Sequence, residues 1–359
     1  MEDTIVRTET ADEAKLQEFV GRMLGDLGAA YIVPLVRIGD ELGLYKALAA
    51  HGPLSSGELA RRTATAERYV REWLSAHAAA GYVQYDGASG HFSMTPEQMM
   101  VFADPDSPVC MLGAFEIAYA SAIDTPKVAE AFRTGHGVGW HDHHQCLFTG
   151  VERFFRAGYE ANLIQGWLPS LDGVVEKLER GARVADVGCG HGVTTALMAK
   201  AFPRSTVIGF DNHRGSIERA SQRIGTGAGG NLSFEVSGAS GFPGSGYDLV
   251  TMFDCLHDMG DPVGAAAHAL RSLSPDGTLM LVEPFAHDRL EDNLNPVGRV
   301  YYAASTMICT PASLAQEVGL ALGAQAGEAR LTEILTRAGF GSVRRAAETP
   351  FNIVLEAKP

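Results

Sequence analysis

Residues 184–192 read Val184-Ala185-Asp186-Val187-Gly188-Cys189-Gly190-His191-Gly192, an apolar strand that runs directly into a glycine-rich turn. The apolar residues after the turn predict a helix over residues 193–201. A strand, a glycine-rich turn and a helix in this order form a nucleotide-binding unit, because glycines let the backbone approach a ligand closely. The stretch therefore predicts an α/β domain that binds its ligand at the carboxyl end of this strand.

From residue 183 onward, strand and helix patterns alternate, which is typical of a Rossmann-like, doubly wound parallel sheet. The connection over residues 283–330 is longer than a crossover needs, which predicts an inserted element over the carboxyl edge of the sheet. A glycine-rich loop is expected at residues 225–230. Seven strands are expected, at residues 183–187, 206–210, 232–236, 247–253, 278–282, 342–345 and 352–357.

The N-terminal part is helical, with apolar residues three and four apart at residues 16–27 and again at 38–48, after Pro34. Two shorter helical patterns at 54–62 and 66–80 precede a hairpin pattern at 81–85 and 90–93. Helix, helix and hairpin in this order predict a winged helix. One winged helix cannot cover the apolar faces of residues 11–50, so we expect these helices to pair in a homodimer.

The composition limits which partners the protein can bind and which cellular compartment it is expected to occupy. The 359 residues include 43 acids and 29 bases, a net charge of −14, which disfavours DNA and anionic membranes. Residues 51–100 hold four arginines against five acids, so the alternative of a winged-helix DNA-binding regulator lacks its basic stripe. The start resembles no signal peptide and no run of about 18 apolar residues occurs, so we expect a cytoplasmic protein without a membrane segment. Five scattered cysteines predict reduced thiols.

Two features of the turn distinguish between cofactors. The pattern is G-x-G-x-G and not the G-x-G-x-x-G of dinucleotide enzymes, and Asp186 within the strand suits a cationic amino-acid moiety better than a pyrophosphate. Asp211 follows the second strand, where an acid binds ribose hydroxyls. With this strand context, the residues resemble the first two motifs of class I S-adenosylmethionine-dependent methyltransferases.

The resemblance implies S-adenosylmethionine as the cofactor. The family often has an acid after the third strand for the adenine amine, whereas this chain has Val236-Ser237-Gly238-Ala239-Ser240. We therefore expect the adenine to contact the backbone of Gly238 and Ala239, or Ser240. The expected cofactor-binding residues are Asp186, Gly188, Cys189, Gly190, Gly192, Asp211, Asn212, Gly238, Ala239, Phe253 and Asp254.

Acid and base candidates follow the fourth and fifth strands. His257-Asp258 comes after the fourth and Val282-Glu283-Pro284 after the fifth, both at the carboxyl edge. Together with the winged helix, this resembles small-molecule O-methyltransferases of secondary metabolism, including actinobacterial ones. The resemblance implies that His257 is the general base for an acceptor hydroxyl and that Glu283 orients it. The alternatives are a helix-capping His257, or C- or N-methylation without a base.

Four histidines and a cysteine lie close together in the sequence, at His136, His141, His143, His144 and Cys146. Their spacing is poor for a structural zinc site, so no metal is expected. They line or cap a loop, or His144 or His141 faces the acceptor as a hydrogen-bond partner or second base. Most aromatic residues nearby are expected in the core, and a subset in an apolar acceptor pocket.

These patterns divide the chain into three expected parts. Residues 11–105 form a helical dimerisation and winged-helix domain, residues 106–170 a helical linker and acceptor-pocket segment, and residues 171–359 the class I methyltransferase domain.

Overall fold

A computed structural model describes residues 11–222 and 230–359, so the loop expected at 225–230 lies almost wholly outside the described residues. The chain forms two compact units, one ending at Phe115 and one spanning Glu116–Pro359. The division into parts at residues 11–105, 106–170 and 171–359 stays a prediction.

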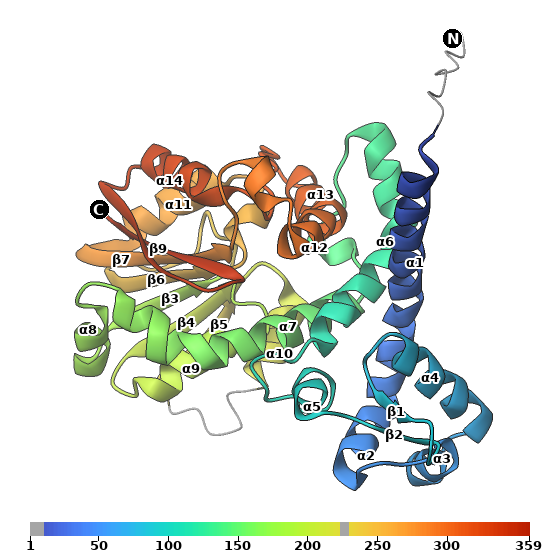
Figure 1. The fold of residues 1–359 in the computed structure, drawn as a ribbon. Helices are drawn as coiled ribbons and strands as arrows, with labels where there is room; N and C mark the ends of the chain where they lie inside the picture. The colour runs from blue at the N-terminus through green and yellow to red at the C-terminus, as the bar shows by residue number, and fades with distance from the viewer. Residues whose placement is uncertain (1–10, 223–229) are drawn as a thin grey trace. The chain divides into compact units, whose positions relative to one another are not determined.

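The first unit contains helices and one small hairpin (Figure 1). A core of apolar side chains encloses Trp73, whose indole N–H donates to the Leu35 carbonyl at 2.9 Å, and Tyr45, whose hydroxyl is 2.7 Å from His77 Nε2. Burial lowers the pKa of His77 to about 4, so this imidazole is a neutral core residue at neutral pH. The elements are α1 (Glu13–Glu41), α2 (Leu44–His51), α3 (Ser56–Thr63), α4 (Glu67–Ala79), β1 (Gln84–Asp86), β2 (His91–Ser93) and α5 (Pro96–Phe102).

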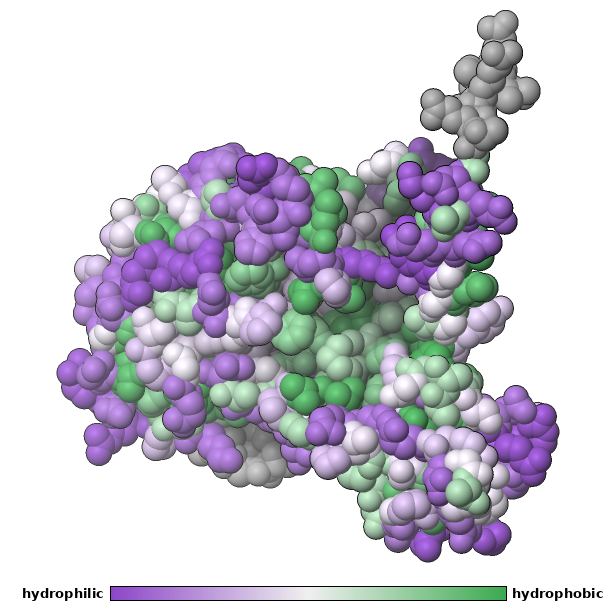
Figure 2. All heavy atoms as spheres, viewed as in Figure 1, coloured by the Kyte–Doolittle hydropathy of each residue, from purple (hydrophilic) through white to green (hydrophobic). Residues whose placement is uncertain are grey.

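Helix α1 is longer than the sequence pattern suggested, because it continues through Pro34 and ends at Glu41. A proline inside a helix removes one backbone hydrogen bond, but Pro34 does not end α1. The break between α1 and α2 lies at Gly43, which takes a left-handed conformation at φ 68°. Leu24 and Leu27 on α1 are 64% and 54% exposed. Both hydrophobic and hydrophilic residues are visible along this helix in Figure 2. By length and composition, α1 is also the one candidate for a membrane-crossing helix among the described residues.

The second unit is built on a seven-stranded sheet with the strand order β5-β4-β3-β6-β7-β9-β8. The pairs from β5 to β7 are parallel, and β9 pairs antiparallel with both β7 and β8. The seven strands start at or near the expected residues, which confirms the predicted fold class. They are β3 (Arg183–Val187), β4 (Thr206–Asp211), β5 (Leu232–Val236), β6 (Tyr247–Phe253), β7 (Leu273–Pro284), β8 (Ser342–Glu348) and β9 (Asn352–Lys358).

Helices cover both faces of this sheet (Figure 1). One core packs α11 (Pro262–Ser272) and α14 (Gly327–Ala338) on one face, and the other packs α8 (Val174–Arg180) and α9 (Val193–Ala201) on the opposite face. The unit also contains α7 (Cys146–Asn162), α10 (Arg214–Ser221) and most of α6 (Leu112–Thr134).

The expected insertion between β7 and α14 is present. It contains α12 (Pro296–Ala304) and α13 (Thr310–Leu314), joined by a π-helical turn at Ser305–Cys309. The Ser313 hydroxyl on α13 donates to the Met259 carbonyl at 2.8 Å, which places this insertion against the loop after β6. The carboxyl edge of the sheet is therefore enclosed by α13 as well as by the strand ends.

Candidate functional site

A cavity of about 410 Å³ lies at the carboxyl edge of the sheet, within the second unit. Its volume is in the range of about 300–1,000 Å³ that small-molecule sites occupy. Its walls come from the ends of β3, β4, β5 and β6 and from α7 and α13. Among the expected cofactor residues, those that line it are Gly188, Cys189, Gly190, Asp211, Asn212, Gly238, Ala239, Phe253 and Asp254.

Asp186 is not one of the described residues that line the cavity. Its carboxylate is fully buried and accepts hydrogen bonds from the hydroxyls of Thr194 at 2.7 Å, Thr195 at 2.6 Å and Thr251 at 2.8 Å. These bonds connect β3 to the first turn of α9 and to β6. In this structure Asp186 fixes the shape of the glycine-rich turn, and the three threonines were not singled out in the sequence.

The glycines at the carboxyl edge of the sheet have different roles. Gly190 and Gly238 line the cavity, and a Cβ added to either would meet no atom within 4 Å, so the backbone is open to a ligand there. Gly192 does not line the cavity among the described residues. It has φ 75°, and a Cβ there would lie 2.4 Å from Phe234, so Gly192 is required for packing. Burial raises the pKa of the Cys189 thiol well above its usual value, which leaves it a neutral side chain in the turn.

Asp211 ends β4 and faces the cavity. Its carboxylate accepts the backbone N–H of Gly190 at 2.9 Å and of His213 at 2.8 Å, and burial raises its pKa. Each oxygen can accept a further bond, so the carboxylate keeps capacity for ligand hydroxyls. The ring of His213 stacks on Phe148 with centroids 4.8 Å apart, and Phe148 lines the same cavity.

The structure brings His257 and Glu283 together. The Nδ1 of His257 and a carboxylate oxygen of Glu283 are within hydrogen-bond distance, and the other Glu283 oxygen accepts the Leu256 N–H at 2.9 Å. The two residues follow β6 and β7, which are neighbouring parallel strands. The N-cap of α11 is Asp261, so His257 does not cap that helix.

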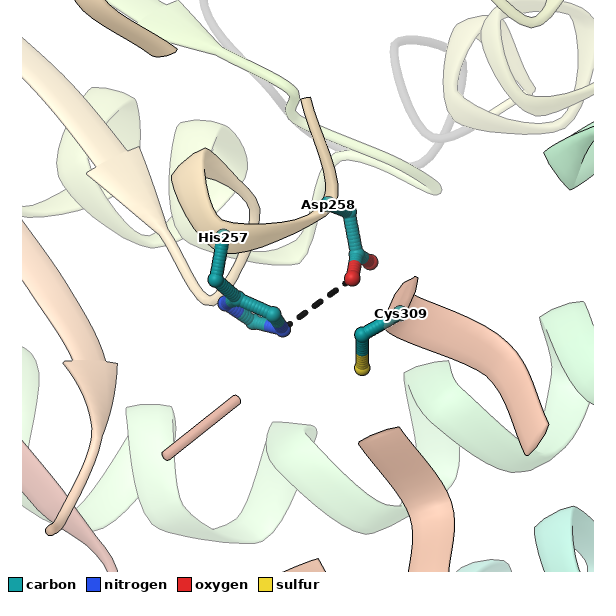
Figure 3. A group of neighbouring side chains, drawn as sticks. All are labelled: His257, Asp258 and Cys309. Carbon is teal, nitrogen blue, oxygen red and sulfur yellow. Dashed lines mark ion pairs between the residues drawn. The ribbon is translucent and has the colours of Figure 1, made fainter. Parts of the chain in front are cut away.

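On its other side, His257 faces Asp258 and Cys309 (Figure 3). Its Nε2 lies 3.2 Å from Asp258 Oδ1, and these atoms and the Cys309 sulfur lie within 4.8 Å of one another. His257 is 4% exposed and does not line the cavity among the described residues, whereas Asp258 does. Burial alone would lower the pKa of His257, but the charges of Glu283 and Asp258 outweigh it and raise this pKa well above its ordinary value. The two carboxylates therefore stabilise the protonated form of this imidazole.

The histidine cluster is divided between separate roles. The His144 backbone N–H donates to Asp124 at 2.8 Å, and its Nδ1 accepts the Cys146 N–H at 3.3 Å at the start of α7. His143 is buried with its Nδ1 3.1 Å from the same Asp124 carboxylate. Its ring stands next to an acid that the sequence did not suggest, because Asp124 lies 19 residues earlier on α6. Of these histidines, His141 stacks on His213 with centroids 4.9 Å apart.

Asp254 occupies an unusual position in the cavity wall. It is a non-glycine residue with φ 48°, and its carboxylate accepts the Tyr159 hydroxyl at 2.7 Å and the Asn352 side-chain amide at 2.9 Å. Burial and the negative charge of Glu283 raise the pKa of Asp254 to about 8. Asn352 was missed as a site residue, since it lies 98 positions away from Asp254 in the sequence. Tyr159 belongs to the aromatic residues of which a subset was expected in the acceptor pocket, but its bond to Asp254, 95 positions away, was not predicted.

Comparisons with known proteins agree with this architecture. Residues 178–339 match the methyltransferase domain family, and residues 29–103 match the Rv2258c-like winged HTH domain. Trans-aconitate 2-methyltransferase of Streptomyces coelicolor is 35% identical over 104 residues, which are 28% of this chain. The chain spans about a third of the length of that relative, with 34% covered.

Solved structures show the same fold over nearly the whole chain. Mitomycin 7-O-methyltransferase has a TM-score of 0.68 at 19% identity and covers 98% of this chain and 100% of its own. Human N-acetylserotonin methyltransferase, solved with S-adenosylmethionine, has a TM-score of 0.69 at 18% identity and covers 98% of this chain and 99% of its own.

The two domain matches support the sequence-based assignment. A methyltransferase domain of this class takes its methyl group from S-adenosylmethionine, so the predicted cofactor is confirmed together with the domain. The chain thus carries an Rv2258c-like winged HTH domain at residues 29–103, followed in the sequence by a methyltransferase domain at residues 178–339. These two domain matches confirm the predicted enzyme class.

Proposed function

We propose that this protein transfers a methyl group from S-adenosylmethionine to a hydroxyl of a small-molecule acceptor. The observation that carries the proposal is the cavity at the carboxyl edge of the sheet, where the Gly188–Gly190 turn and Asp211 meet the loop that holds His257. In the part of this cavity proposed for the cofactor, the Asp211 carboxylate can accept hydrogen bonds from ribose hydroxyls. The backbone at Gly190 and Gly238 is not covered by other atoms there.

These residues fit the cofactor in chemistry as well as in space. With the cofactor bound, Asp211 would accept hydrogen bonds from the ribose diol, the turn would admit the amino-acid moiety, and Gly238 and Ala239, which line the same cavity, would border the adenine. When bound, S-adenosylmethionine supplies a sulfonium methyl group, which leaves without the S–C electron pair and forms a bond to the acceptor oxygen. The chain's own contribution is to hold both reactants in line and to exclude water, an effect of orientation.

His257 takes up the proton that the acceptor hydroxyl loses, and Glu283 orients the ring. The Nδ1 side is occupied by Glu283, so Nε2, on the side of the cavity-lining Asp258, is the nitrogen that receives the proton. A base must be deprotonated before it acts, and the carboxylates raise the pKa of His257, so the rate rises with pH above neutrality. This arrangement favours O-methylation over C- or N-methylation, which needs no such base.

The same proposal covers the assembly and the compartment. The exposed apolar residues of α1, including Leu24 and Leu27, pair with a second copy in a homodimer. The protein works in the cytoplasm on a small molecule, and the net charge of −14 keeps nucleic acid and anionic membranes from being its partners. Gel shifts on random DNA and flotation with anionic vesicles test both exclusions.

The methyl-transfer proposal is tested by incubating the protein with S-adenosylmethionine and a panel of phenolic, alcoholic and amine acceptors. Mass spectrometry then locates the added methyl group. A product methylated on oxygen supports the proposal, while products methylated only on carbon or nitrogen assign the reaction to the base-free alternatives. A crystal grown with S-adenosylhomocysteine shows whether the ribose lies on Asp211.

A further inference from the structure

The cavity wall is acidic, and its acids are not matched by strong bases. Five carboxylic residues line it, and within the described parts of the chain neither lysine nor arginine does. Among the described lining residues the basic one is His191, whose Nδ1 lies 2.7 Å from Glu152. The five acids are Glu152, Asp211, Asp254, Asp258 and Asp261.

Three of these acids have evident tasks. Glu152 is paired with His191, Asp211 holds two backbone N–H groups, and Asp261 caps α11 by accepting the Gly264 N–H at 2.8 Å. Asp254 and Asp258 remain. Asp258 faces His257, but that imidazole is shared with Glu283.

Among the described residues, the partners of the Asp254 carboxylate are the neutral side chains of Tyr159 and Asn352, and no cation lies at hydrogen-bond distance from it. The charged groups that act on it are Glu283, His257 and Asp258, two carboxylates against one imidazole. Burial and the negative charge of Glu283 raise the pKa of Asp254 to about 8, and the charge of His257 offsets them only in part, so a further positive charge would favour the ionised carboxylate. A bound cation would supply that charge.

The neighbouring wall suits a cation too. Trp140, Phe148, Phe155 and Tyr159 line the same cavity, and the rings of Phe155 and Tyr159 stack with centroids 5.8 Å apart. The faces of aromatic rings attract ammonium groups, and this attraction grows when the site is shielded from water. Tyr159 also donates to Asp254, so the aromatic wall and the carboxylate meet at this residue.

We propose that the cavity selects acceptors that carry a protonated amine, which Asp254 anchors beside the aromatic wall, over neutral and anionic acceptors of the same size. The inference rests on the proposed methyl transfer and adds the chemical class of its substrate. The amine is the anchor, and a hydroxyl elsewhere on the acceptor is the methylated group.

The test compares three probes that differ in charge: benzylamine, benzyl alcohol and benzoate. Their binding is measured by calorimetry and ligand-observed NMR on the full chain saturated with sinefungin, a cofactor analogue with an amine in place of the sulfonium methyl. The same measurement is made with S-adenosylhomocysteine, which carries no positive charge at that position. A partly buried ion pair gains more than an exposed one, so benzylamine should bind at least about tenfold more tightly than benzyl alcohol, and benzoate most weakly.

Variants locate the anchor. Asp254→Asn should bring benzylamine to within about threefold of benzyl alcohol, because the charge is lost while asparagine tolerates the positive φ. Asp254→Gly removes the same charge at that φ and serves if the first variant does not fold. Glu179→Gln, an equal charge change at an exposed position on α8, should keep the wild-type preference.

Three results would overturn the inference. The first is a preference for benzylamine over benzyl alcohol that persists in Asp254→Asn. The second is a failure of benzylamine to bind at about 10 mM, the weak limit for so small a ligand. The third is a preference for benzylamine that is seen with S-adenosylhomocysteine but lost with sinefungin. The last would mean that the acids serve the cofactor's own positive charge. If neither sinefungin nor S-adenosylhomocysteine binds, the proposed function fails; if both bind without an amine preference, only this inference fails.

Discussion

Replacing Asp186 by asparagine tests whether this residue shapes the turn or contacts the cofactor. In the structure its carboxylate accepts three threonine hydroxyls at 2.6–2.8 Å and lies behind the cavity wall. Asparagine keeps one carbonyl oxygen and turns the other acceptor into a donor. One or two buried hydroxyls then lose their acceptor, and the remaining bonds lose the help of a negative charge.

The size of the effect follows from those bonds. A buried polar group left unsatisfied costs about 1–3 kcal/mol, so Asp186→Asn should lower the free energy of unfolding by about 2–4 kcal/mol. For a domain of this size about 1 kcal/mol moves the Tm by roughly 2–4 °C, so the transition of the second unit should fall by roughly 5–15 °C. Thr251→Val removes one of the three bonds and should cost about 1–2 kcal/mol.

Differential scanning calorimetry measures the transition, and titration with S-adenosylhomocysteine below it measures cofactor affinity. We expect a clear loss of stability with at most about a tenfold loss of affinity, because the turn loosens but no ligand contact is removed. Glu179→Gln on the exposed side of α8 controls for the charge change. A variant with wild-type Tm whose affinity nevertheless falls more than tenfold would refute the reasoning and return Asp186 to the ligand-contacting residues.

Three further predictions concern the base and the assembly. His257→Ala should lower kcat by roughly 10²-fold or more with unchanged S-adenosylhomocysteine affinity, and undiminished turnover of a hydroxyl acceptor would remove the base role. The folded-state pKa of His257 is raised, so its contribution to stability is complete below the unfolded pKa of about 6.5 and is lost as pH rises through the folded value. Urea unfolding of wild type and His257→Gln from pH 6 to 10 should therefore show a shrinking difference, and a growing one would contradict this sign. Light scattering should show a dimer that Leu24→Glu dissociates, whereas a wild-type monomer with α1 helical would contradict the pairing.

The strands of the sheet were predictable because their signals are local. Apolar runs bounded by glycine, proline and asparagine place β5 and β6 at the expected residues, and the glycine-rich turn fixes the β3–α9 connection. The His257–Glu283 pair was predictable from topology, since residues after neighbouring parallel strands meet at one sheet edge.

Other parts of the site depend on long-range geometry that the sequence does not display. Asn352 reaches Asp254 because β9 runs antiparallel to β7 and its register places Asn352 opposite Pro284. The position of His257 behind Asp258, and not in the cavity wall, depends on how the chain turns after β6. The hydrogen bonds that tie Asp186 to the turn likewise depend on three hydroxyls from two elements.

The central claim is that the cavity at the carboxyl edge holds S-adenosylmethionine through Asp211. Calorimetric titration of the full chain with S-adenosylhomocysteine and, separately, with NAD tests it most directly. We expect one S-adenosylhomocysteine bound per chain, no comparable binding of NAD, and binding weakened by about 1–3 kcal/mol in Asp211→Ala, the cost of leaving ribose hydroxyls unpaired. Tight NAD binding without S-adenosylhomocysteine binding, or an Asp211→Ala variant with wild-type affinity, would contradict it.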